Sequence, residues 1–573
     1  MKRDFSNSRL YFLFVFFIIL GTIVIGRLFF LQIKEHSKYR KMADAQHIRE
    51  EVIYAKRGKI FFSDGINILA DNQGVSNVAV APREVENEQE VAKTLSSALG
   101  ISEDEILKKI KNKDISWVII KNNVPLSKTE KIDILPGIHF EPHLSRFYPQ
   151  GDIASSVVGF YGYDSKGEKK TGCYGIEEYY QKQLAGIDGF RRGMVDAEQN
   201  PIFSSQNKIK EAVNGSDIVL TIDQNIQFFI EEKVKEAYKK YKPKNITFIV
   251  MSPKTGEILA MASLPNFDPN KYYKEKNSEV FKNPALLSFE PGSIFKPITA
   301  AAGIEEGVIT PQTTYVDKGA VKIGGFTIKN SDLKAHGKRT MTQVIEFSLN
   351  TGVVFIQQRL GRTKFVNYVK KFGFGKKTGI DLFGEELGNI ENIVHPRSNE
   401  KLIECANASF GQGISVTPMQ ILTAFTAIAN QGKMVKPYIV KEIRSPDGKI
   451  KKTKRKVLGQ PISAETASRV SAMMVSTVKN GYSKKADVKG YLIAAKTGTA
   501  QASWSYFGIK KVGYSGKTVQ SFINFAPAFD PKFLILLKMD APTSGPRFSS
   551  DSLAPIAKEI NTYLFGYMGI PPE

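Results

Sequence analysis

Two side chains that could act together as a nucleophile and a base lie three residues apart. Ser293 and Lys296 fall in segment 290–297, EPGSIFKP, at the predicted start of a helix. At this spacing both side chains leave one face of the helix, so a hydroxyl and an amine can touch. Pro297 is tolerated only within the first turn, and the run 298–304 is apolar enough to be buried. Ser293 would then lie where free backbone N–H groups can meet an oxyanion.

The Ser-x-x-Lys pattern alone carries little information, because a serine and a lysine on a solvated surface explain most copies of it. Further copies begin at Ser205, Ser331, Ser398 and Ser476. Ser293 differs in its context, since a Pro-Gly turn precedes it, an apolar helix follows it, and two further motifs come later in the chain.

The second motif is Ser348-Leu349-Asn350. It follows the mostly apolar stretch 344–347 and precedes a glycine at 352, which predicts a junction between a helix and a loop. A hydroxyl there can relay a proton, and an amide can hold a substrate carbonyl. The alternative is a helix cap or a turn, and Ser-x-Asn also occurs at Ser205.

The third motif is Lys496-Thr497-Gly498-Thr499, directly after a predicted apolar strand at 491–495. On an edge strand Lys496 and Gly498 would share one side, and glycine would let a substrate backbone lie close. The Lys-Thr-Gly triplet also occurs at Lys170, Lys254 and Lys377. Only the copy at Lys496 combines the preceding apolar run with a second threonine.

Composition narrows the class of protein. A chain of 573 residues is too long for one compact domain, so two or three are expected. The net charge of +23 is scattered except for a dense run at 449–456, and no nucleic-acid motif accompanies it. An anionic envelope or membrane surface explains the charge, as does solubility. Cys173 and Cys405 form neither a disulfide framework nor a metal site, and no metal or cofactor is expected.

Residues 10–33 are almost free of charge and long enough to cross a bilayer core of about 30 Å. No small-residue cleavage site follows, so we expect an uncleaved anchor instead of a signal peptide. A buried core helix is less consistent with the absence of a polar face. Lysines and arginines flank both ends, so their distribution does not decide the orientation.

The remaining pattern divides into two parts. Residues 34–215 alternate short strands with turns and contain a small helical subdomain at 84–131. After a polar linker, a strand at 217–222 leads into a helix that Asp223 can cap, and a hairpin follows at 247–262. Later elements are predicted as helices at 341–360, 416–429 and 551–567 and as strands at 491–495, 519–525 and 533–538. Strands at both ends of one domain with helices between them predict an α+β fold.

Taken together in this order, the three motifs resemble those of the penicillin-binding proteins, in particular the class B monofunctional transpeptidases. The resemblance covers nearly the whole chain. It includes RGKI at 57–60, GDIA at 151–154, GIE at 175–177, FGFG at 372–375 and SFGQG at 409–413. Asn350 is similar to the septal, cell-division type, since the elongation type tends to carry Ser-x-Asp. Leu349 departs from the serine usual in the division type.

The resemblance implies a domain order and a fold. Residues 1–9 would be a cytoplasmic tail, 10–33 a transmembrane anchor, 34–215 a mostly-β pedestal, and 216–573 a transpeptidase domain. That last domain would have a five-stranded antiparallel sheet packed with helices. The chain would sit in the inner membrane with its N-terminus in the cytoplasm and its catalytic domain outside.

The resemblance also implies a reaction. Ser293 would attack the carbonyl of a D-alanyl-D-alanine stem peptide, and an amine from a neighbouring strand would resolve the acyl-enzyme. Lys296 would be the base, Ser348 a proton relay and Lys496 a source of charge, while Thr497 and Thr499 hold the terminal carboxylate. Expected partners are stem peptides, β-lactams, a membrane-embedded glycosyltransferase and other divisome proteins. Open alternatives are an elongation-type transpeptidase, a β-lactam hydrolase or sensor, and a scaffold.

Overall fold

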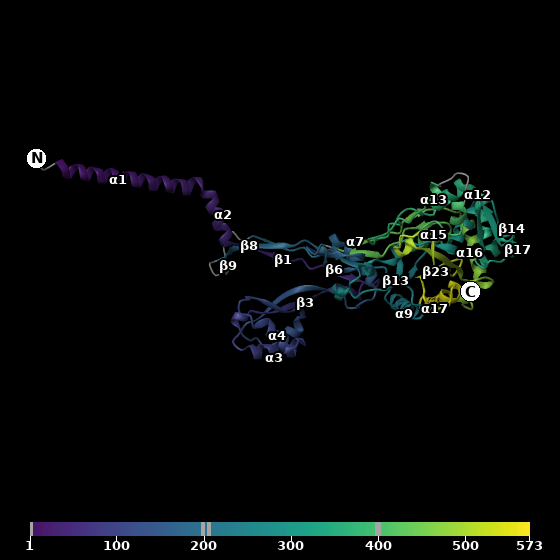
Figure 1. The fold of residues 1–573 in the computed structure, drawn as a ribbon, viewed down its shortest axis with the longest axis horizontal. Coiled ribbons are helices and arrows are strands. Elements are labelled where there is room, and N and C mark those ends of the chain that lie inside the picture. The colour runs from purple at the N-terminus through teal and green to yellow at the C-terminus, as the bar shows by residue number, and fades with distance from the viewer. Residues whose placement is uncertain (1–3, 165, 196–200, 203–207, 396–402, 573) are drawn as a thin grey trace. The chain divides into compact units, whose positions relative to one another are not determined.

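The structure of the chain is a computed structural model. It describes residues 4–164, 166–195, 201–202, 208–395 and 403–572. Two compact units are formed (Figure 1). The first, unit 1, comprises Met1–Lys56 and Ala185–Gly215, and the second, unit 2, comprises Arg57–Leu184 and Ser216–Glu573.

Unit 1 begins with a long apolar helix. α1 (Asp4–Phe29) continues into a π-helical turn (Phe30–Lys34), and α2 (His36–His47) follows. Residues 8–34 have a mean hydropathy of 2.5 and none of their most apolar window is buried, so this helix is long and apolar enough to cross a membrane. The rest of unit 1 is an antiparallel sheet of β1 (Ile48–Ile53), β8 (Gly189–Val195), β9 (Pro201–Ile202) and β10 (Lys208–Lys210).

Unit 2 contains a mixed sheet that joins segments far apart in the sequence. Its strands run in the order β20-β19-β11-β2-β3-β4, and β5 also pairs with β3. Their bounds are β2 (Ile60–Phe61), β3 (Ile68–Val80), β4 (Val118–Pro125), β5 (Ile138–Phe147), β11 (Asp217–Leu220), β19 (Val440–Arg444) and β20 (Ile450–Lys452). β2 and β11 pair in parallel through Ile60 with Ile218 and Phe61 with Val219, so two segments about 160 residues apart lie side by side.

The helical subdomain predicted at 84–131 is present and has its own core. α3 (Glu88–Leu99) is capped by Asn87 and α4 (Glu103–Ile110) by Ser102, each through its side chain. The predicted apolar stripe is buried and packs against the inner face of β3 and β4, as one cluster. Its members include Val91, Leu95, Leu99, Ile106 and Ile110.

Three segments that are remote in sequence meet at one buried carboxylate. Glu177 is fully buried and accepts hydrogen bonds from Arg57 Nε at 2.7 Å, Arg146 Nε at 2.7 Å and Tyr148 Oη at 3.1 Å. Arg57 Nη2 also bonds to the same carboxylate. Burial alone would raise the pKa of Glu177, but Arg146 and Arg57 outweigh it and hold that pKa below its usual range.

A five-stranded antiparallel sheet forms the centre of unit 2, in the order β13-β12-β24-β23-β22, as predicted. The strands are β12 (Asn245–Met251), β13 (Ile258–Leu264), β22 (Ala494–Ser503), β23 (Tyr514–Ala526) and β24 (Phe533–Asp540). The sheet is assembled from a hairpin early in the unit and three strands near its end. β22 is the edge strand of this sheet and pairs only with β23 among the described strands.

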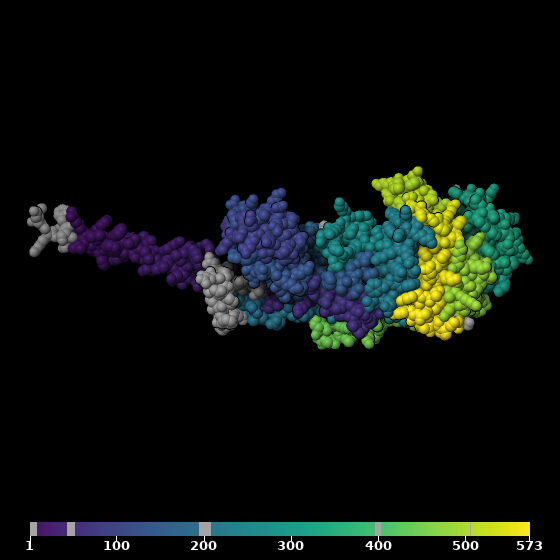
Figure 2. Space-filling model, turned by 90° about the horizontal axis from the view of Figure 1, so that it is seen from below, coloured from purple at the N-terminus to yellow at the C-terminus, as the bar shows by residue number. Residues whose placement is uncertain are grey.

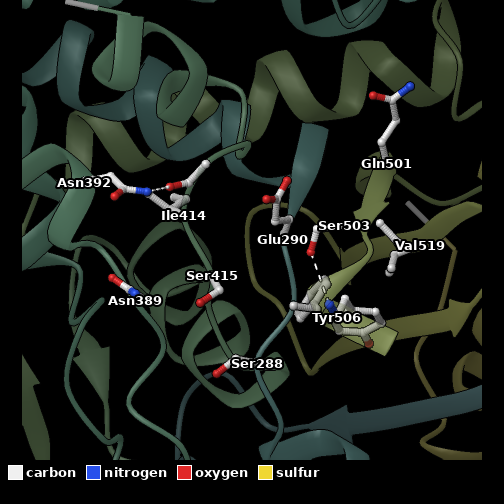
Figure 3. A pocket seen from close by; sticks show the side chains of 13 residues that line it. Ser288, Glu290, Asn389, Asn392, Ile414, Ser415, Gln501, Ser503, Tyr506 and Val519 are labelled. Atoms are coloured by element: carbon white, nitrogen blue, oxygen red, sulfur yellow. Dashed lines mark hydrogen bonds between the residues drawn. The ribbon is translucent and has the colours of Figure 1, made fainter. Parts of the chain in front are cut away.

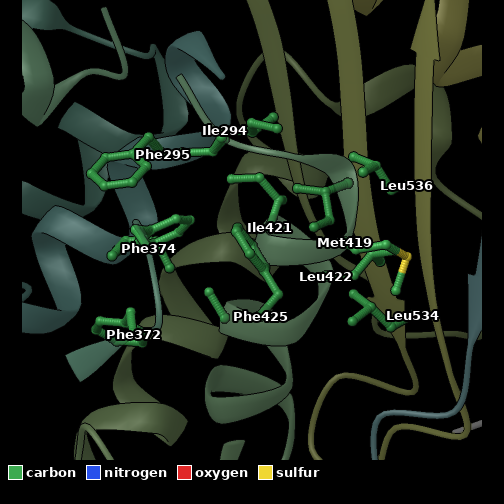
Figure 4. Packing of buried hydrophobic residues seen from close by; sticks show 14 of the residues in the cluster. Ile294, Phe295, Phe372, Phe374, Met419, Ile421, Leu422, Phe425, Leu534 and Leu536 are labelled. Atoms are coloured by element: carbon green, nitrogen blue, oxygen red, sulfur yellow. The ribbon is translucent and has the colours of Figure 1, made fainter. Parts of the chain in front are cut away.

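Helices cover both faces of this sheet (Figure 1). α9 (Gln224–Tyr241) and α17 (Ser549–Tyr567) pack on one face, and α17 forms a yellow band on the molecular surface in Figure 2. Asp223 caps α9 as predicted. The other face holds α10 (Lys296–Glu305), α12 (Asn350–Lys371) and α15 (Pro418–Ala429), with α16 (Ala464–Lys479) at the β22 edge. Figure 4 shows Met419 and Leu422 of α15 on the side of Leu534 and Leu536 of β24.

The smaller elements connect these layers. They are α5 (Leu126–Thr129), α6 (Ser155–Val158), α7 (Gly175–Tyr179), α8 (Gln181–Ala185), α11 (Met341–Glu346), α13 (Glu391–Val394), α14 (Ile403–Ser409), β6 (Phe160–Tyr163), β7 (Lys170–Cys173), β14 (Thr314–Asp317), β15 (Ala320–Ile323), β16 (Phe326–Lys329), β17 (Gly337–Thr340), β18 (Met434–Val435) and β21 (Val457–Gly459).

The bounds of the elements that carry the second and third motifs differ from the prediction. The helix expected over 341–360 is divided into α11 and α12, because Ser348 adopts a positive φ of 53° between them. The strand expected at 491–495 begins only at Ala494 and runs on to Ser503. The motif at 496–499 therefore lies on an edge strand, as expected, although that strand starts later than the apolar run does.

Candidate functional site

Ser293 lies in a tight turn that leads directly into α10. A 3-10 turn at Gly292–Phe295 precedes the helix, and Pro297 occupies its first turn, as the sequence predicts. Gly292 has a φ of 57°, which favours glycine. Ser293 is half-buried, whereas Lys296 is fully buried.

The turn is held by the segment 409–413. Gly292 N donates a hydrogen bond of 2.9 Å to Gly411 O, and Thr299 Oγ1 donates one of 2.7 Å to Ser409 O. A Cβ atom on Gly411 would lie 2.3 Å from Gly292 O, so only glycine allows this approach. The backbone around Ser293 is thereby fixed from both sides.

Lys296 contacts the second motif instead of Ser293. Its Nζ donates hydrogen bonds to Asn350 Oδ1 at 2.7 Å, to Ser348 Oγ at 3.1 Å and to the carbonyl oxygen of Ser348. Within the described residues Ser293 Oγ forms no hydrogen bond, so the direct contact expected from the three-residue spacing is not made. The positive φ of Ser348 turns its carbonyl towards the amine, and these oxygens take the place of the Ser293 hydroxyl.

Lys496 reaches the same hydroxyl from β22. Its Nζ donates to Ser348 Oγ at 2.9 Å and to Thr497 O at 3.0 Å, and its side chain is almost completely buried. Ser348 Oγ therefore lies between two lysine amines. The three predicted motifs converge in the structure, although about 200 residues separate the first from the last.

Burial of the two amines changes their acidity. Burial lowers the pKa of Lys296 well below its usual range, and the neighbouring Lys496 lowers it further. Burial also lowers the pKa of Lys496, to about 7. The lowered pKa favours the neutral amine form of Lys296, which can accept a proton from an adjacent hydroxyl.

The structure gives a packing reason for a glycine at position 498. A Cβ atom there would lie 2.3 Å from Ser521 Oγ and 2.9 Å from Ile294 Cγ2. Its missing side chain thus lets β22 pack against the turn that carries Ser293. Thr499 Oγ1 accepts a 3.4 Å hydrogen bond from Ser549 N at the start of α17, while Thr497 is nearly buried.

The copies of the Ser-x-x-Lys pattern at Ser331 and Ser476, which lie among the described residues, are not among the residues bonded to Lys296 or Lys496. Ser331 lies in an exposed turn, and Ser476 lies on α16 and bonds to Glu346. Ser205 and Ser398 lie outside the described residues. Cys405 is buried and Cys173 half-buried, and both are free thiols.

A polar cavity of about 370 Å³ beside the Ser293 turn was not predicted. Figure 3 shows Glu290 at its centre, facing Asn392 and Ile414 on one side and Ser503 on the other. Burial raises the pKa of Glu290 to about 7. The one feature of the sequence that could have indicated this cavity is the carboxylate of Glu290, three residues before Ser293.

Comparison with known proteins agrees with this geometry. Residues 246–562 match the penicillin binding protein transpeptidase domain, and residues 52–220 match the penicillin-binding protein dimerisation domain. Stage V sporulation protein D of Bacillus subtilis is 34% identical, covering 99% of this chain and 87% of its own. Peptidoglycan D,D-transpeptidase FtsI of Escherichia coli is 27% identical, covering 96% and 90%.

Solved structures give the same result. Penicillin binding protein 2X from Streptococcus thermophilus superimposes with a TM-score of 0.74 at 26% identity, covering 91% of this chain and 80% of its own. Penicillin binding protein 3 from Mycobacterium tuberculosis, complexed with aztreonam, has a TM-score of 0.69 at 28% identity, covering 91% and 98%. The chain belongs to the class B penicillin-binding proteins, with a dimerisation domain and a transpeptidase domain.

Proposed function

We propose that this chain is a peptidoglycan D,D-transpeptidase that cross-links stem peptides through an acyl-enzyme on Ser293. Support comes from the family, from the name of the E. coli relative, and above all from one observation. Two buried lysine amines converge on Ser348 Oγ beside the Ser293 turn, at 3.1 and 2.9 Å. This arrangement supplies a neutral base and a proton relay at the place where a serine nucleophile needs them.

The first half-reaction forms the acyl-enzyme. Binding of the donor peptide draws Lys296 Nζ to Ser293 Oγ, whose proton it takes as the oxygen attacks the penultimate D-alanyl carbonyl. Catalytic hydrogen bonds commonly tighten only when substrate is bound. Backbone N–H groups of Ser293 and Thr499 stabilise the oxyanion. The C–N bond then breaks, and the leaving D-alanine amine receives a proton from Ser348 Oγ, which is replenished by the lysine amines.

The second half-reaction runs the same path in reverse with another amine. The acceptor amine attacks the ester carbonyl and gives up a proton to Ser348, which passes it to the lysine amines. The Ser293 oxygen then leaves and takes a proton from Lys296. Thr497 and Thr499 bind the terminal carboxylate of the donor, with Lys496 supplying positive charge in its protonated state. Asn350 holds both Lys296 and the donor amide.

Covalent labelling of the full-length chain in detergent with a fluorescent penicillin tests this assignment. We expect stable labelling that Ser293→Ala abolishes. Ser331→Ala is the matched control, because it removes the serine of another Ser-x-x-Lys copy on an exposed turn, and it should label like the wild type. Labelling that survives Ser293→Ala would mean that another serine is the nucleophile. No labelling of folded wild-type protein would favour the scaffold alternative.

Slow release of the bound penicillin separates a transpeptidase from a β-lactam hydrolase or sensor. No separate base directed at water belongs to the three motifs, so the acyl-enzyme should persist for many minutes. Rapid turnover of penicillin would favour the hydrolase.

A septal role is the second part of the proposal, and Asn350 in the second motif favours it over the elongation type. The relative named for stage V of sporulation makes action at that stage a competing role with the same chemistry. Localisation of a fluorescent fusion would distinguish them: septal signal in growing cells supports the first, and signal restricted to sporulating cells the second.

Membrane topology and partners complete the proposal. Residues 10–33 anchor the chain in the inner membrane with residues 1–9 in the cytoplasm, a pedestal follows over 34–215, and the catalytic domain at 216–573 lies outside. A membrane-embedded glycosyltransferase and other divisome proteins would bind the anchor and the pedestal. Replacement of 10–33 by an unrelated apolar helix should abolish co-purification of the glycosyltransferase while penicillin labelling persists. Unchanged co-purification would assign the contact elsewhere.

A further inference from the structure

The cavity beside the Ser293 turn is built from segments that continue the catalytic motifs. One wall is Ser288–Glu290, immediately before the turn, and another is 413–415, just after the glycine that packs on it. The third wall is Gln501–Ser503, which follows Thr499 on β22. Its volume of about 370 Å³ is within the range of pockets that bind small molecules or single side chains.

The order of groups along β22 places this cavity on one side of the reacting bond. Lys496 and Ser348, the proposed relay to the leaving amine, lie at one end of the motif. The oxyanion position at Thr499 follows, and Gln501 comes after it. Under the proposed function, the leaving D-alanine lies on the Lys496 side, so the cavity lies on the acyl side, where the donor strand continues.

The cavity carries one carboxyl group that has no cationic partner. Tyr514 Oη donates to Glu290 Oε2 at 3.2 Å, and no lysine, arginine or histidine among the described residues forms an ion pair with Glu290. Lys538, whose amine lies 4.9 Å from the ring centroid of the lining residue Phe289, is already paired with Asp540 at 2.7 Å. Tyr506 lines the cavity and donates its hydroxyl to the same aspartate. A positively charged guest would therefore meet an uncompensated acid.

We propose that this cavity is a subsite for the ammonium-bearing side chain of the donor strand, the residue next to the acylated D-alanine, with Glu290 as its counter-ion. The proposal rests on the proposed function. In that reaction the acceptor strands supply an amine, and donor and acceptor strands are the same polymer, so the donor carries the same amine. Figure 3 shows the Glu290 carboxylate directed into the open centre of the cavity, which suits a charge-assisted hydrogen bond.

The path of the reaction rules out the acceptor amine as the group that binds in this cavity. It must attack the ester carbonyl from the position that the leaving amine vacated, because the two half-reactions follow the same path in opposite directions. That position adjoins Ser348 and Lys496. An amine held by Glu290 lies on the other side of the carbonyl and cannot replace the leaving group.

Two donor peptides that differ in one charge test the subsite. Nα-acetyl-Lys-D-Ala-D-Ala carries a free side-chain amine, and the Nα,Nε-diacetyl peptide has the same chain with that amine blocked. With full-length protein in detergent and D-alanine release as the readout, we expect kcat/KM to be at least about tenfold higher for the free amine, the size of one charge-assisted hydrogen bond. Glu290→Gln should reduce this ratio to about one.

Matched variants make the test independent of one substitution. Glu279→Gln removes an exposed carboxylate outside the cavity and should keep the wild-type ratio. Gln501 is exposed at the cavity wall, so Gln501→Lys and Gln501→Glu should fold. The lysine variant should lower the ratio and the glutamate variant raise it, each by roughly threefold for a solvent-screened charge. A cooperative thermal melt establishes that Glu290→Gln is folded. If that variant does not fold, Gln501→Lys and Gln501→Glu still test the subsite.

The outcomes separate the two proposals. Equal kcat/KM for both peptides in the wild type, or a preference that persists in Glu290→Gln and responds to neither Gln501 variant, would overturn the subsite while leaving the transpeptidase function intact. No D-alanine release from either peptide together with no penicillin labelling would overturn the proposed function, and the subsite with it.

Discussion

Removal of the buried charge of Glu177 should destabilise unit 2 strongly. In Glu177→Gln, the guanidinium groups of Arg57 and Arg146, with 8% and 3% of their side chains exposed, lose the carboxylate that accepts from both. Breaking a buried ion pair by removing one partner costs about 3–5 kcal/mol, because an uncompensated charge remains in a medium that solvates it poorly. Tyr148 also loses a charged acceptor.

Urea unfolding at neutral pH measures this effect. With a slope of about 3 kcal/mol per M, a loss of about 3–5 kcal/mol lowers the midpoint by about 1 M or more. Labelling by a fluorescent penicillin reports whether the site around Ser293 is still folded. We expect it to be lost at the same urea concentrations as the folded structure, because Tyr148 and Ile176 share one continuous core with Phe295. Asp71→Asn breaks the half-exposed pair with Lys59 and should cost about 1 kcal/mol or less.

The pH dependence gives a second check. The pKa of Glu177 is lowered in the folded state, so its contribution is complete above the unfolded value near 4.5 and is lost as the pH falls through the folded value. The midpoints of wild type and variant should therefore converge in acid. A midpoint that falls by less than about 0.3 M at neutral pH would refute the reasoning, since it would mean that both guanidinium groups find water or other acceptors.

Two further changes test the site itself. Lys496→Gln removes a cation that lowers the pKa of Lys296, so the pKa of Lys296 should rise. In a pH profile of the penicillin-labelling rate, the acidic limb should therefore move to higher pH. An unmoved limb would contradict the coupling of the two amines. Gly411→Ala forces a Cβ atom to 2.3 Å from Gly292 O and should slow labelling by more than about tenfold, whereas Gly459→Ala, where nothing lies within 4 Å, should label like the wild type.

Local patterns predicted the local elements well. The helix capped by Asp223, the hairpin of β12 and β13, and the apolar stripe of α3 and α4 each depend on contacts between residues near in sequence, and all are present. The start of β22 was misplaced because the apolar run 491–493 packs as irregular chain against α17, and hydrophobicity alone does not distinguish that from a strand.

Contacts between distant segments were beyond the sequence pattern. Nothing in the spacing of the motifs indicated that Lys296 would bond to Ser348, 52 residues away, in place of Ser293 three residues away. The same holds for Glu177 of α7, which bonds to Arg57 in the segment before β2 and to Arg146 near the end of β5. Glu290 was visible as a residue, but its role depends on a cavity whose other walls come from 413–415 and 501–503.

The low pKa of Lys296 follows from the core that surrounds it as much as from its polar partners. Protonating this amine would place a charge in a buried environment beside a second amine, and both effects cost free energy. The neutral form of Lys296 is therefore favoured even though no other base removes its proton. Ile294 and Phe295, both fully buried, flank the turn, and Phe295 packs on Phe374 at 5.1 Å between ring centroids (Figure 4). Substitutions that admit water to this core would raise the pKa of Lys296 and slow acylation near neutral pH even with every hydrogen bond of the site in place. Packing and chemistry are therefore linked at this site, because the apolar residues set the protonation state on which the nucleophile depends.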